Sequence, residues 1–588
     1  MAERNHRLID GKVMKYLLPS VMMTMALQLG NVVDTILVGN LLGTQAMSAI
    51  RLCLPMMTVE QLLGYGLGTG AAVCVGILLG KRDRQGASRI FSTVFWLTLA
   101  VGLLFMAAAF PLAGPIANLL ARGGELTELT RQYIFIWMLG GPIVGVGLYL
   151  TNFMGLDSHP ELASGYIIVS NVINLILDYI FLAWTPLGIM GAALSTMIGL
   201  LAGMVVFVRY FRSKDRTLKL EAPKTLSPVL DAAKAGVPTI IYMGMTFVES
   251  LGSNYIILGI LGIDGMTIYT VCKNVLLIML MTTGGIIGVI PSLSGVLYGE
   301  RDYYGLRAVC VRTLKITAAA TAVVLLVVMT FTGAIAGMFG IRQGPLLQHT
   351  VPAMRCFMLC LPFYVWNKFL TSYYQSIEQT KMASMITFLQ GGVIMLPAAY
   401  LGITLGLRLG RTGLNAMGLS FLASEGLTAL AVMVYRKIKH PGKGVFILPG
   451  NNSGDCLDVT IQAKPEAVTA LARQVLDFCL GKGVERTLAN RMTVAAEEMM
   501  QNAIAYGGAR SEWIDFCVAV DEQQIRLRIR DNGVPFDPTS YVFDGEDFDI
   551  SGIEIVKRIA SRVSYVRAID LNNTVIEINR QEAEETPA

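Results

Sequence analysis

The sequence predicts a polytopic α-helical membrane protein with twelve transmembrane helices in two six-helix lobes, followed by a small C-terminal α/β sandwich domain. Three observations predict this fold class. Of the 588 residues, 54% are hydrophobic and only 15% are charged, whereas a soluble globular protein carries roughly 25% charged residues. The charges lie between long apolar runs up to about residue 435 and become frequent after about residue 455. The apolar region also repeats itself internally.

Twelve apolar segments are long enough to cross a bilayer, which takes about 20 mostly apolar residues in a helix. We expect these spans at 13–40, 47–79, 92–112, 130–153, 162–185, 188–211, 232–260, 267–297, 308–340, 351–375, 381–405 and 411–436. Lys and Arg concentrate in alternate connecting segments, such as 81–84 and 436–439. Because positively charged loops remain on the inner side, we expect a plasma-membrane protein (the inner membrane of the cell) whose N- and C-termini are both cytoplasmic.

The repeat shows most clearly at the ends of two predicted spans. Residues 66–86 read GLGTGAAVCVGILLGKRDRQG and residues 285–305 read GIIGVIPSLSGVLYGERDYYG, which share a Gly-x-Arg-Asp-x-x-Gly pattern at an offset of 219. Pro19 aligns with Pro238 at the same offset. We therefore expect an N-terminal lobe at 1–225 and a C-terminal lobe at 226–440, with the substrate path between them.

Carboxylates at membrane depth are costly and are functional candidates by default. Asp34 lies in the first predicted span and Asp178 in the fifth, with Asn174 one helical turn before Asp178 on the same face. Two close carboxylates cannot both ionise cheaply in a dry setting, so a proton or a Na⁺ ion must compensate their charge. A hydrogen-bonding role of Asp178 at a helix end is the structural alternative.

Three stretches of the apolar region resemble the multidrug and toxic compound extrusion (MATE) family. They are NVVDTILVGNLLG at 31–43, the glycine-rich stretch ending in LGKRD at 66–83, and NVINLILD at 171–178. The resemblance covers about residues 8–440. It implies two six-helix lobes around a central cavity, and export of organic, often cationic, compounds in exchange for Na⁺ or H⁺. It also implies that one cation-coupling site comprises Asp34, Asn174, Asp178 and Thr196, whose oxygen atoms suit Na⁺.

The second half carries its own ionisable residues within predicted spans, namely Glu249, Lys273, Lys368 and Glu425. Isolated burial of such groups is expensive, so we expect either pairing or a watery cavity. Glu249 and Lys273 lie on adjacent predicted helices and form a structural ion pair in one interpretation. In the other, Glu249, Lys273 and Lys368 line the substrate cavity, where two lysines would also fit an anionic or zwitterionic substrate.

Beyond a linker at 441–455, the pattern changes to that of a small α/β domain at 456–580, followed by a disordered tail at 581–588. Period-2 alternation predicts strands and amphipathic runs predict helices. We expect strands at 457–462, 512–520 and 524–531, helices at 465–481, 485–506 and 552–562, and a final pair of strands within 563–578.

Three stretches of this domain resemble the nucleotide-binding boxes of GHKL ATPases of the anti-sigma-factor serine-kinase type. They read AAEEMMQNAIAYGG, RDNGVPFDP and DISGIEIVKRIA. Glu498 and Asn502 lie four residues apart on one helix face. The resemblance implies that Asn502 binds the Mg²⁺ of the nucleotide and that Glu498 is a catalytic base for an attacking hydroxyl.

The second and third boxes supply the remaining candidate nucleotide ligands. By the same resemblance, Asp531 accepts a hydrogen bond from the adenine amino group, Gly533 lets the backbone approach the base, and Gly552 helps cradle phosphate at a helix N-terminus. The sequence departs from the family at three positions: Ile550 replaces the first glycine of the third box, Glu554 lies near the phosphate position, and Tyr506 replaces a histidine.

Three functions are consistent with these features. The first is a Na⁺- or H⁺-coupled antiporter that exports small organic compounds and carries a cytoplasmic regulatory domain, which binds ATP and Mg²⁺ and contacts a regulatory protein. The second is a membrane-anchored serine/threonine kinase of the anti-sigma type that uses the transporter part as a sensor. The third is a lipid-linked saccharide flippase. Membrane lipid is an expected partner and nucleic acid is not, because the net charge of +5 reflects Lys and Arg in loops. The nine cysteines form neither a CxxC pair nor a His/Cys cluster, so no disulfide framework or zinc site is indicated.

Overall fold

The computed structural model describes residues 7–580 except 63, 65–66, 81–83, 155–159, 213–217, 224–226, 300–301, 378, 411, 443, 447–455, 509–512, 542–550 and 569–570. The chain forms two compact units. We call Ser20–Ile287 with Ile316–Lys439 the helical unit, and Met1–Pro19 with Gly288–Lys315 and His440–Ala588 the sheet unit. The repeat residues Arg82, Asp83 and Arg301, Ile550 of the third box, most of the linker, and the predicted tail at 581–588 lie outside the described residues.

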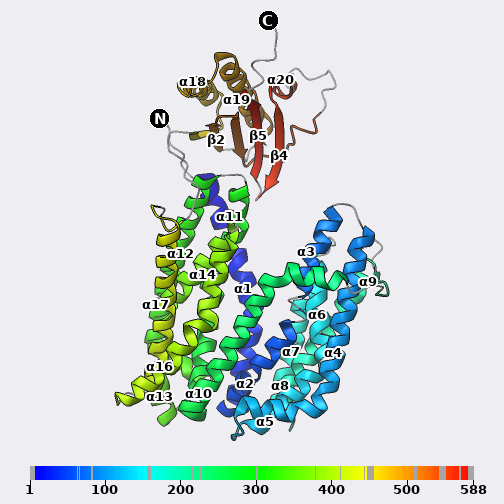
Figure 1. Cartoon of the computed structure of the whole chain (residues 1–588), viewed down its shortest axis with the longest axis vertical. Helices are drawn as coiled ribbons and strands as arrows, with labels where there is room; N and C mark the ends of the chain where they lie inside the picture. The colour runs from blue at the N-terminus through cyan, green and yellow to red at the C-terminus, as the bar shows by residue number, and fades with distance from the viewer. Residues whose placement is uncertain are drawn as a thin grey trace. The chain divides into compact units, whose positions relative to one another are not determined.

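Long helices make up the chain as far as Lys439 (Figure 1). They are α1 (Arg7–Leu41), α2 (Thr44–Gln61), α3 (Leu67–Gly80), α4 (Arg84–Ala121), α5 (Thr127–Leu139), α6 (Gly141–Met154), α7 (Pro160–Trp184), α8 (Ile189–Gly203), α9 (Val205–Arg212), α10 (Ser227–Ile287), α11 (Val289–Gly299), α12 (Tyr303–Met338), α13 (Pro345–Met358), α14 (Leu361–Ser376), α15 (Thr380–Phe388), the π-helix η2 (Leu389–Val393), α16 (Met395–Arg408) and α17 (Gly413–Lys439).

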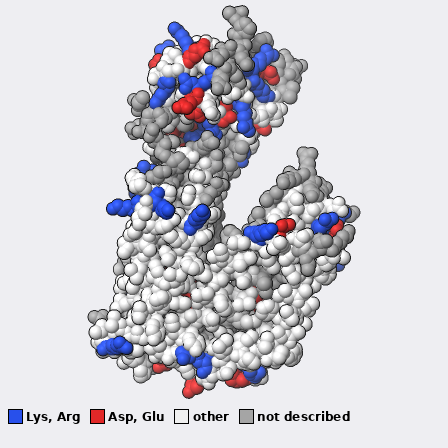
Figure 2. Space-filling view, viewed as in Figure 1, with Lys and Arg blue, Asp and Glu red and all other residues white. Residues whose placement is uncertain are grey.

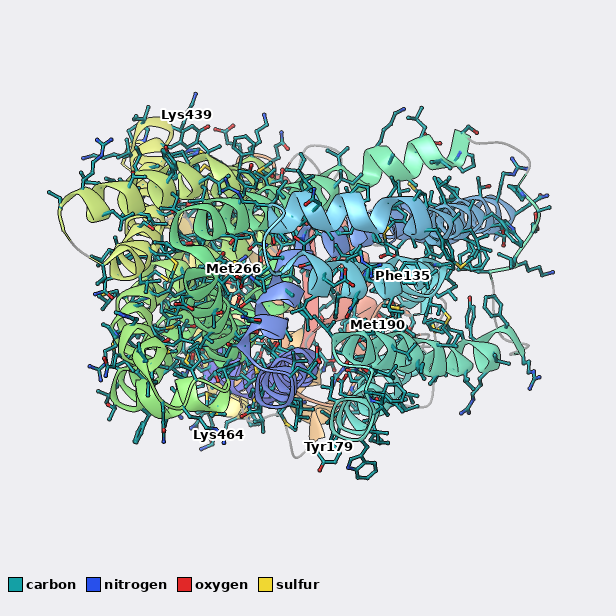
Figure 3. All side chains as sticks on the ribbon, turned by 90° about the horizontal axis from the view of Figure 1, so that it is seen from below. Phe135, Tyr179, Met190, Met266, Lys439 and Lys464 are labelled. Carbon is teal, nitrogen blue, oxygen red and sulfur yellow. The ribbon has the colours of Figure 1, made fainter. Side chains whose placement is uncertain are left out.

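The described residues include seven helices that are long and apolar enough to cross a membrane, or eight if one bent pair is a single span. The helical unit shows a broad surface almost without charge among its coloured residues, with Lys, Arg, Asp and Glu toward its ends (Figure 2). From below, the helices that carry Phe135, Tyr179 and Met190 gather on one side, and those that carry Met266 and Lys439 on the other (Figure 3).

Bends and breaks separate this arrangement from the twelve straight segments that hydropathy predicts. The expected span at 47–79 consists of α2 and α3, and the one at 130–153 consists of α5 and α6, which bend by 56°. The connection expected at 261–266, between the spans at 232–260 and 267–297, contains Gly262, where α10 divides into two helices. Gly262 has a φ of 67°, in the left-handed region that glycine adopts without steric cost.

Glycines allow α7 and α8 to approach closely beside the predicted coupling residues. A Cβ atom at Gly199 on α8 would lie 2.7 Å from the Ser170 carbonyl oxygen and 2.9 Å from the Asn174 Cβ, both on α7. A Cβ atom at Gly203 would lie 2.0 Å from the Ser170 Oγ. The small residues therefore set the spacing that brings side chains of α7 and α8 within hydrogen-bond reach.

A five-stranded antiparallel sheet forms the C-terminal part of the sheet unit, with strand order β1-β2-β3-β5-β4. Its elements are β1 (Cys456–Gln462), α18 (Pro465–Gly481), α19 (Arg486–Tyr506), β2 (Trp513–Val520), β3 (Gln524–Asp531), α20 (Ser551–Ile559), β4 (Arg562–Ala568) and β5 (Leu571–Asn579). Every strand and helix predicted for this domain is thereby confirmed, with boundaries displaced by a few residues.

Strand alternation places two different sets of side chains on the two faces of β3. Ile525, Leu527 and Ile529 join the apolar core with residues of α18 and α19. The residues between them are Arg526, Arg528 and Arg530, of which Arg528 and Arg530 are nevertheless buried, at 6% and 1% exposure. The arginine face of the sheet is therefore covered within the sheet unit.

Candidate functional site

Two carboxyl groups meet in the helical unit, one from α1 and one from α7. The carboxyl groups of Asp34 and Asp178 are close enough to interact electrostatically. Asp178 is fully buried. Within the described part of the chain, Asp34 Oδ1 and Asp178 Oδ2 accept no hydrogen bond from any donor. A proton or a small cation is the group that would satisfy these oxygens, because two adjacent buried carboxylates repel each other.

The neighbouring polar residues come from α7 and α8. The Asn174 Nδ2 donates to the Thr196 Oγ1 at 3.3 Å, and the Ser195 Oγ donates to the Asp178 Oδ1. The structure thus brings together all four predicted coupling residues. It adds Ser195, which sequence reasoning missed although it directly precedes Thr196.

A cavity of about 230 Å³ adjoins this group. Asp34, Asn174 and Thr196 line it, whereas Asp178 does not. The remaining wall is largely aromatic and apolar, with Tyr133, Trp137, Tyr166, Met57, Val144, Leu148 and Leu200 among its residues. An acidic group at the edge of an aromatic pocket is an arrangement that suits organic cations. The two aromatic residues on α5 carried no sequence signal beyond their apolar spacing.

The charged residues of the second half fall into separate groups. The Lys273 Nζ lies 2.6 Å from the Glu249 Oε1, across the break in α10. The Glu425 carboxylate accepts hydrogen bonds from the amides of Asn367 at 2.8 Å and Gln390 at 2.7 Å. The Lys368 Nζ instead lies 5.7 Å from the ring centroids of Tyr242 and Tyr364. Glu249 and Lys273 therefore form the ion pair of the structural interpretation, and Lys368 is not part of it.

In the sheet unit, the side chain of Asp531 is buried at the end of β3. Its Oδ1 accepts hydrogen bonds from the Gly533 N–H at 2.8 Å and the Asn572 Nδ2 at 2.9 Å. Burial raises the pKa of the Asp531 carboxyl above its usual value, and these donors partly offset the rise. Asn572 belongs to β5, far along the chain, and no sequence motif had indicated it.

A narrow pocket lies beside Asp531. Its volume is about 30 Å³, and its walls include Asn502, Tyr506, Phe536 and Asn572. The rings of Tyr506 and Phe536 stack with centroids 5.9 Å apart. The Asn502 Nδ2 is buried without a hydrogen-bond partner among the described residues. The hydrogen-bond donors and acceptors of this pocket fit a nucleotide base. The pocket has room for about one water molecule, so the side chains around it must move before a base can enter.

The third box meets the first in the sheet unit. A Cβ atom at Gly552, near the start of α20, would lie 2.1 Å from the Glu498 Oε2. Glycine is therefore needed for this approach of α20 to α19. The candidate base Glu498 and Asn502 lie on α19, and Gly552 lies on the adjoining α20.

A second buried charge cluster joins β3 to the start of α12. The Asp302 Oδ2 accepts a hydrogen bond from the Arg530 Nη1 at 2.8 Å, and the Asp302 Oδ1 lies 3.5 Å from the Arg528 Nη2. The Oδ1 also accepts a hydrogen bond from the Gly305 N–H at 2.9 Å, which is the N-cap interaction of a helix. Asp302 therefore caps α12 and neutralises two buried arginines of the sheet.

Two family models match the chain. The model described as MatE matches residues 19–180 and 238–401. The two matched stretches begin 219 residues apart, which confirms the internal repeat. The model described as the histidine kinase-like ATPase domain matches residues 461–578, in agreement with the predicted nucleotide-binding domain.

Curated relatives match a large part of the chain. A multidrug export protein MepA of Staphylococcus aureus strain MRSA252 is 26% identical over 438 residues, which cover 72% of this chain and 92% of the relative. A protein of the same name from Staphylococcus haemolyticus strain JCSC1435 is 28% identical over 240 residues, covering 40% of this chain and 53% of the relative.

Solved structures of similar fold are also known. An inward-facing multidrug resistance MATE family transporter of the MOP superfamily matches with a TM-score of 0.64 at 19% identity, covering 72% of this chain and 97% of its own. An outward-facing structure of such a transporter matches with a TM-score of 0.57 at 18% identity, covering 73% of this chain and 95% of its own. These likenesses establish the fold of the helical part.

Proposed function

The chain belongs to the MatE family, and from this membership we propose that it is an antiporter that exports organic compounds in exchange for Na⁺ or H⁺. We also propose that its ATPase-like C-terminal domain binds ATP with Mg²⁺ and regulates transport from the cytoplasm. Twelve transmembrane helices in two six-helix lobes, cytoplasmic termini and a plasma-membrane location belong to the same proposal. The multidrug export proteins among its relatives support the organic substrate class.

The observation that carries the antiport proposal is the pairing of half-buried Asp34 with buried Asp178, each with one oxygen that no described donor satisfies. In this proposal, Asp34 and Asp178 hold the cation, the Ser195 hydroxyl orients Asp178, and Asn174 and Thr196 supply further oxygens. Only one cation or proton is needed to make the pair tolerable at membrane depth. Release of that cation leaves repelling carboxylates on α1 and α7, which would bias the relative positions of these helices.

Gradient-driven efflux of ethidium from proteoliposomes tests the antiport proposal. The reconstituted full chain is given an inward-directed Na⁺ gradient, an inward-directed H⁺ gradient, or neither. We expect one gradient to drive ethidium movement against its concentration difference, because the exchanged ion supplies the free energy. Equal, purely downhill flux under all three conditions would refute coupled exchange.

The regulatory proposal is supported by the positions of two neighbouring residues on β3. Asp531 belongs to the nucleotide pocket, and Arg530 binds Asp302 at the start of α12. The helix α12 is itself long and apolar enough to cross a membrane. A nucleotide that binds beside Asp531 and shifts β3 would therefore move the neighbouring residue Arg530, which binds Asp302 at the start of this candidate span. The kinase role of Glu498 and the flippase alternative remain predictions from the sequence.

Nucleotide binding provides the next prediction. Asp531→Ala is expected to weaken binding of Mg²⁺-ATP to the full chain by about tenfold to a hundredfold, since a hydrogen bond to a charged group contributes roughly 1.5–3 kcal/mol. Isothermal titration calorimetry of the protein in nanodiscs measures the affinity for ATP. Asn502→Ala is expected to make the affinity for ATP independent of Mg²⁺. The exposed acid on α18, changed as Asp477→Ala, is the matched control. Equal affinities in wild type and Asp531→Ala would argue against this adenine site.

A further inference from the structure

Lys368 on α14 faces a second cavity of the helical unit, distinct from the one beside Asp34. This cavity measures about 390 Å³. Its walls come from three helices: Thr239, Ile241 and Tyr242 on α10, Lys368, Thr371, Ser372 and Gln375 on α14, and Ala383, Ser384 and Thr387 on α15. Most of these side chains are polar but uncharged, and Lys368 is the only cationic residue among them.

Within the described part of the chain, no salt bridge joins Lys368 to a carboxylate, although Glu425 and Glu249 act on its charge from a greater distance. The nearby lysine, Lys273, is paired with Glu249 at 2.6 Å. The buried acid Glu425 is instead satisfied by the amides of Asn367 and Gln390. The Lys368 Nζ lies 5.7 Å from the ring centroids of Tyr242 and Tyr364. An ammonium group at membrane depth is costly and marks a substrate path or a ligand site.

The donors around Lys368 are those that recognise an oxyanion. An ammonium group offers three hydrogen-bond donors, a glutamine amide offers two, and each serine hydroxyl offers one. Ser372, Gln375 and Ser384 supply such groups to the cavity. Among the described wall residues there is no Asp or Glu to repel an anion. The cavity beside Asp34 is the reverse case, because it combines an acid with aromatic walls.

We propose that Lys368 and the hydroxyl and amide groups around it bind the carboxylate, phosphate or sulfonate group of an organic ligand. If the protein exports organic compounds, as proposed above, its substrates then include organic acids and zwitterions, in addition to cations. Binding itself requires no ion gradient, so the oxyanion site can be tested independently of antiport.

Two fluorescent probes that differ by one carboxylate give the sharpest test. Nε-dansyl-lysine carries an amine and a carboxylate, and dansylcadaverine is the same molecule without the carboxylate. Fluorescence titration of the full chain in phosphatidylcholine nanodiscs is expected to give about tenfold tighter binding of the acid, the effect of one hydrogen-bonded charge pair. Lys368→Gln should make the two affinities converge, whereas Lys368→Arg should keep the preference.

Lys381→Gln is the matched control, because Lys381 is an exposed lysine on α15 outside the cavity walls. It should retain the wild-type preference for the acid. The proposal is overturned if wild type does not prefer the acid, or if Lys368→Gln prefers it as strongly as wild type does. Retained probe preference without gradient-driven ethidium efflux would refute the antiport proposal alone.

A phospholipid headgroup offers the same oxyanion chemistry as a soluble substrate. Repeating the titrations in nanodiscs that also contain phosphatidylglycerol separates the two sources. If an anionic lipid fills the site, the wild-type preference for Nε-dansyl-lysine disappears in these nanodiscs, while Lys368→Gln is unaffected by the lipid. If the preference persists, the site serves soluble ligands. Either result depends on an oxyanion at Lys368.

Discussion

Asp34→Asn and Asp178→Asn are each expected to abolish gradient-driven efflux in proteoliposomes. Asparagine keeps the shape of the side chain but removes the charge that binds a proton or Na⁺. Removing a carboxylate that pairs with the bound cation costs about 2–5 kcal/mol, which is at least about thirtyfold in cation affinity. Transport measured under the gradient that drives wild type should therefore fall by at least this factor.

The control for both variants is Asp264→Asn, which removes an exposed carboxylate close to the break in α10. This variant should transport at the wild-type rate. Ethidium binding in the absence of a gradient shows whether the Asp34 and Asp178 variants are folded. If both variants transport at the wild-type rate under the gradient, the pair has no coupling role. Asp178 would then have the structural alternative described in the sequence analysis, a hydrogen-bonding role at a helix end.

Asp302→Ala is expected to release β3 from the start of α12. The substitution removes the carboxylate that pairs with the buried guanidinium groups of Arg528 and Arg530, and it removes the N-cap of α12. Breaking a buried ion pair in this way costs about 3–5 kcal/mol. Hydrogen exchange in the peptide that covers residues 302–310 should accelerate by about a hundredfold or more, as measured by mass spectrometry of the full chain.

Two variants separate charge from capping in this cluster. Asp302→Asn keeps a good N-cap residue but loses the charge, so the exchange rate should lie between those of wild type and Asp302→Ala. Arg526→Ala changes another arginine of β3, whose Nε lies 3.7 Å from the Oε1 of Glu577 on β5. The side chains of Arg526 and Glu577 are 24% and 21% exposed. A pair near the surface contributes about 0–1 kcal/mol, so this control should change little. Unaltered exchange in Asp302→Ala would contradict the proposed contact.

Local patterns in the sequence predicted the soluble domain well, because its strands alternate between core and opposite face. The same reasoning placed Asn174 and Asp178 together, since residues four apart share a helix face. Hydropathy placed a connection at 261–266, which contains the break at Gly262, but it carried the span at 130–153 through the bend between α5 and α6. Gly140, Gly141 and Pro142 lie at that bend, and an average over a hydropathy window does not register them.

Contacts between distant residues were beyond sequence reasoning. Asn572 reaches Asp531 across 41 positions, and Arg530 reaches Asp302 across 228. Each needs the tertiary fold before its polar groups can meet. The alternating pattern of β3 favours a solvent-facing position for Arg528 and Arg530. Their burial in the structure shows that another segment covers this face of the sheet.

The double use of Asp302 limits how this protein can be recombined with its relatives. A chimera that grafts the ATPase-like domain onto another transporter of the family would need an acid at the first residue before the corresponding helix. Without it, Arg528 and Arg530 would lose the carboxylate that pairs with both of them here. Conversely, a transporter part separated from the ATPase-like domain would keep Asp302 as the N-cap of α12. The domain therefore needs this residue of the transporter part, whereas the cap does not need the domain.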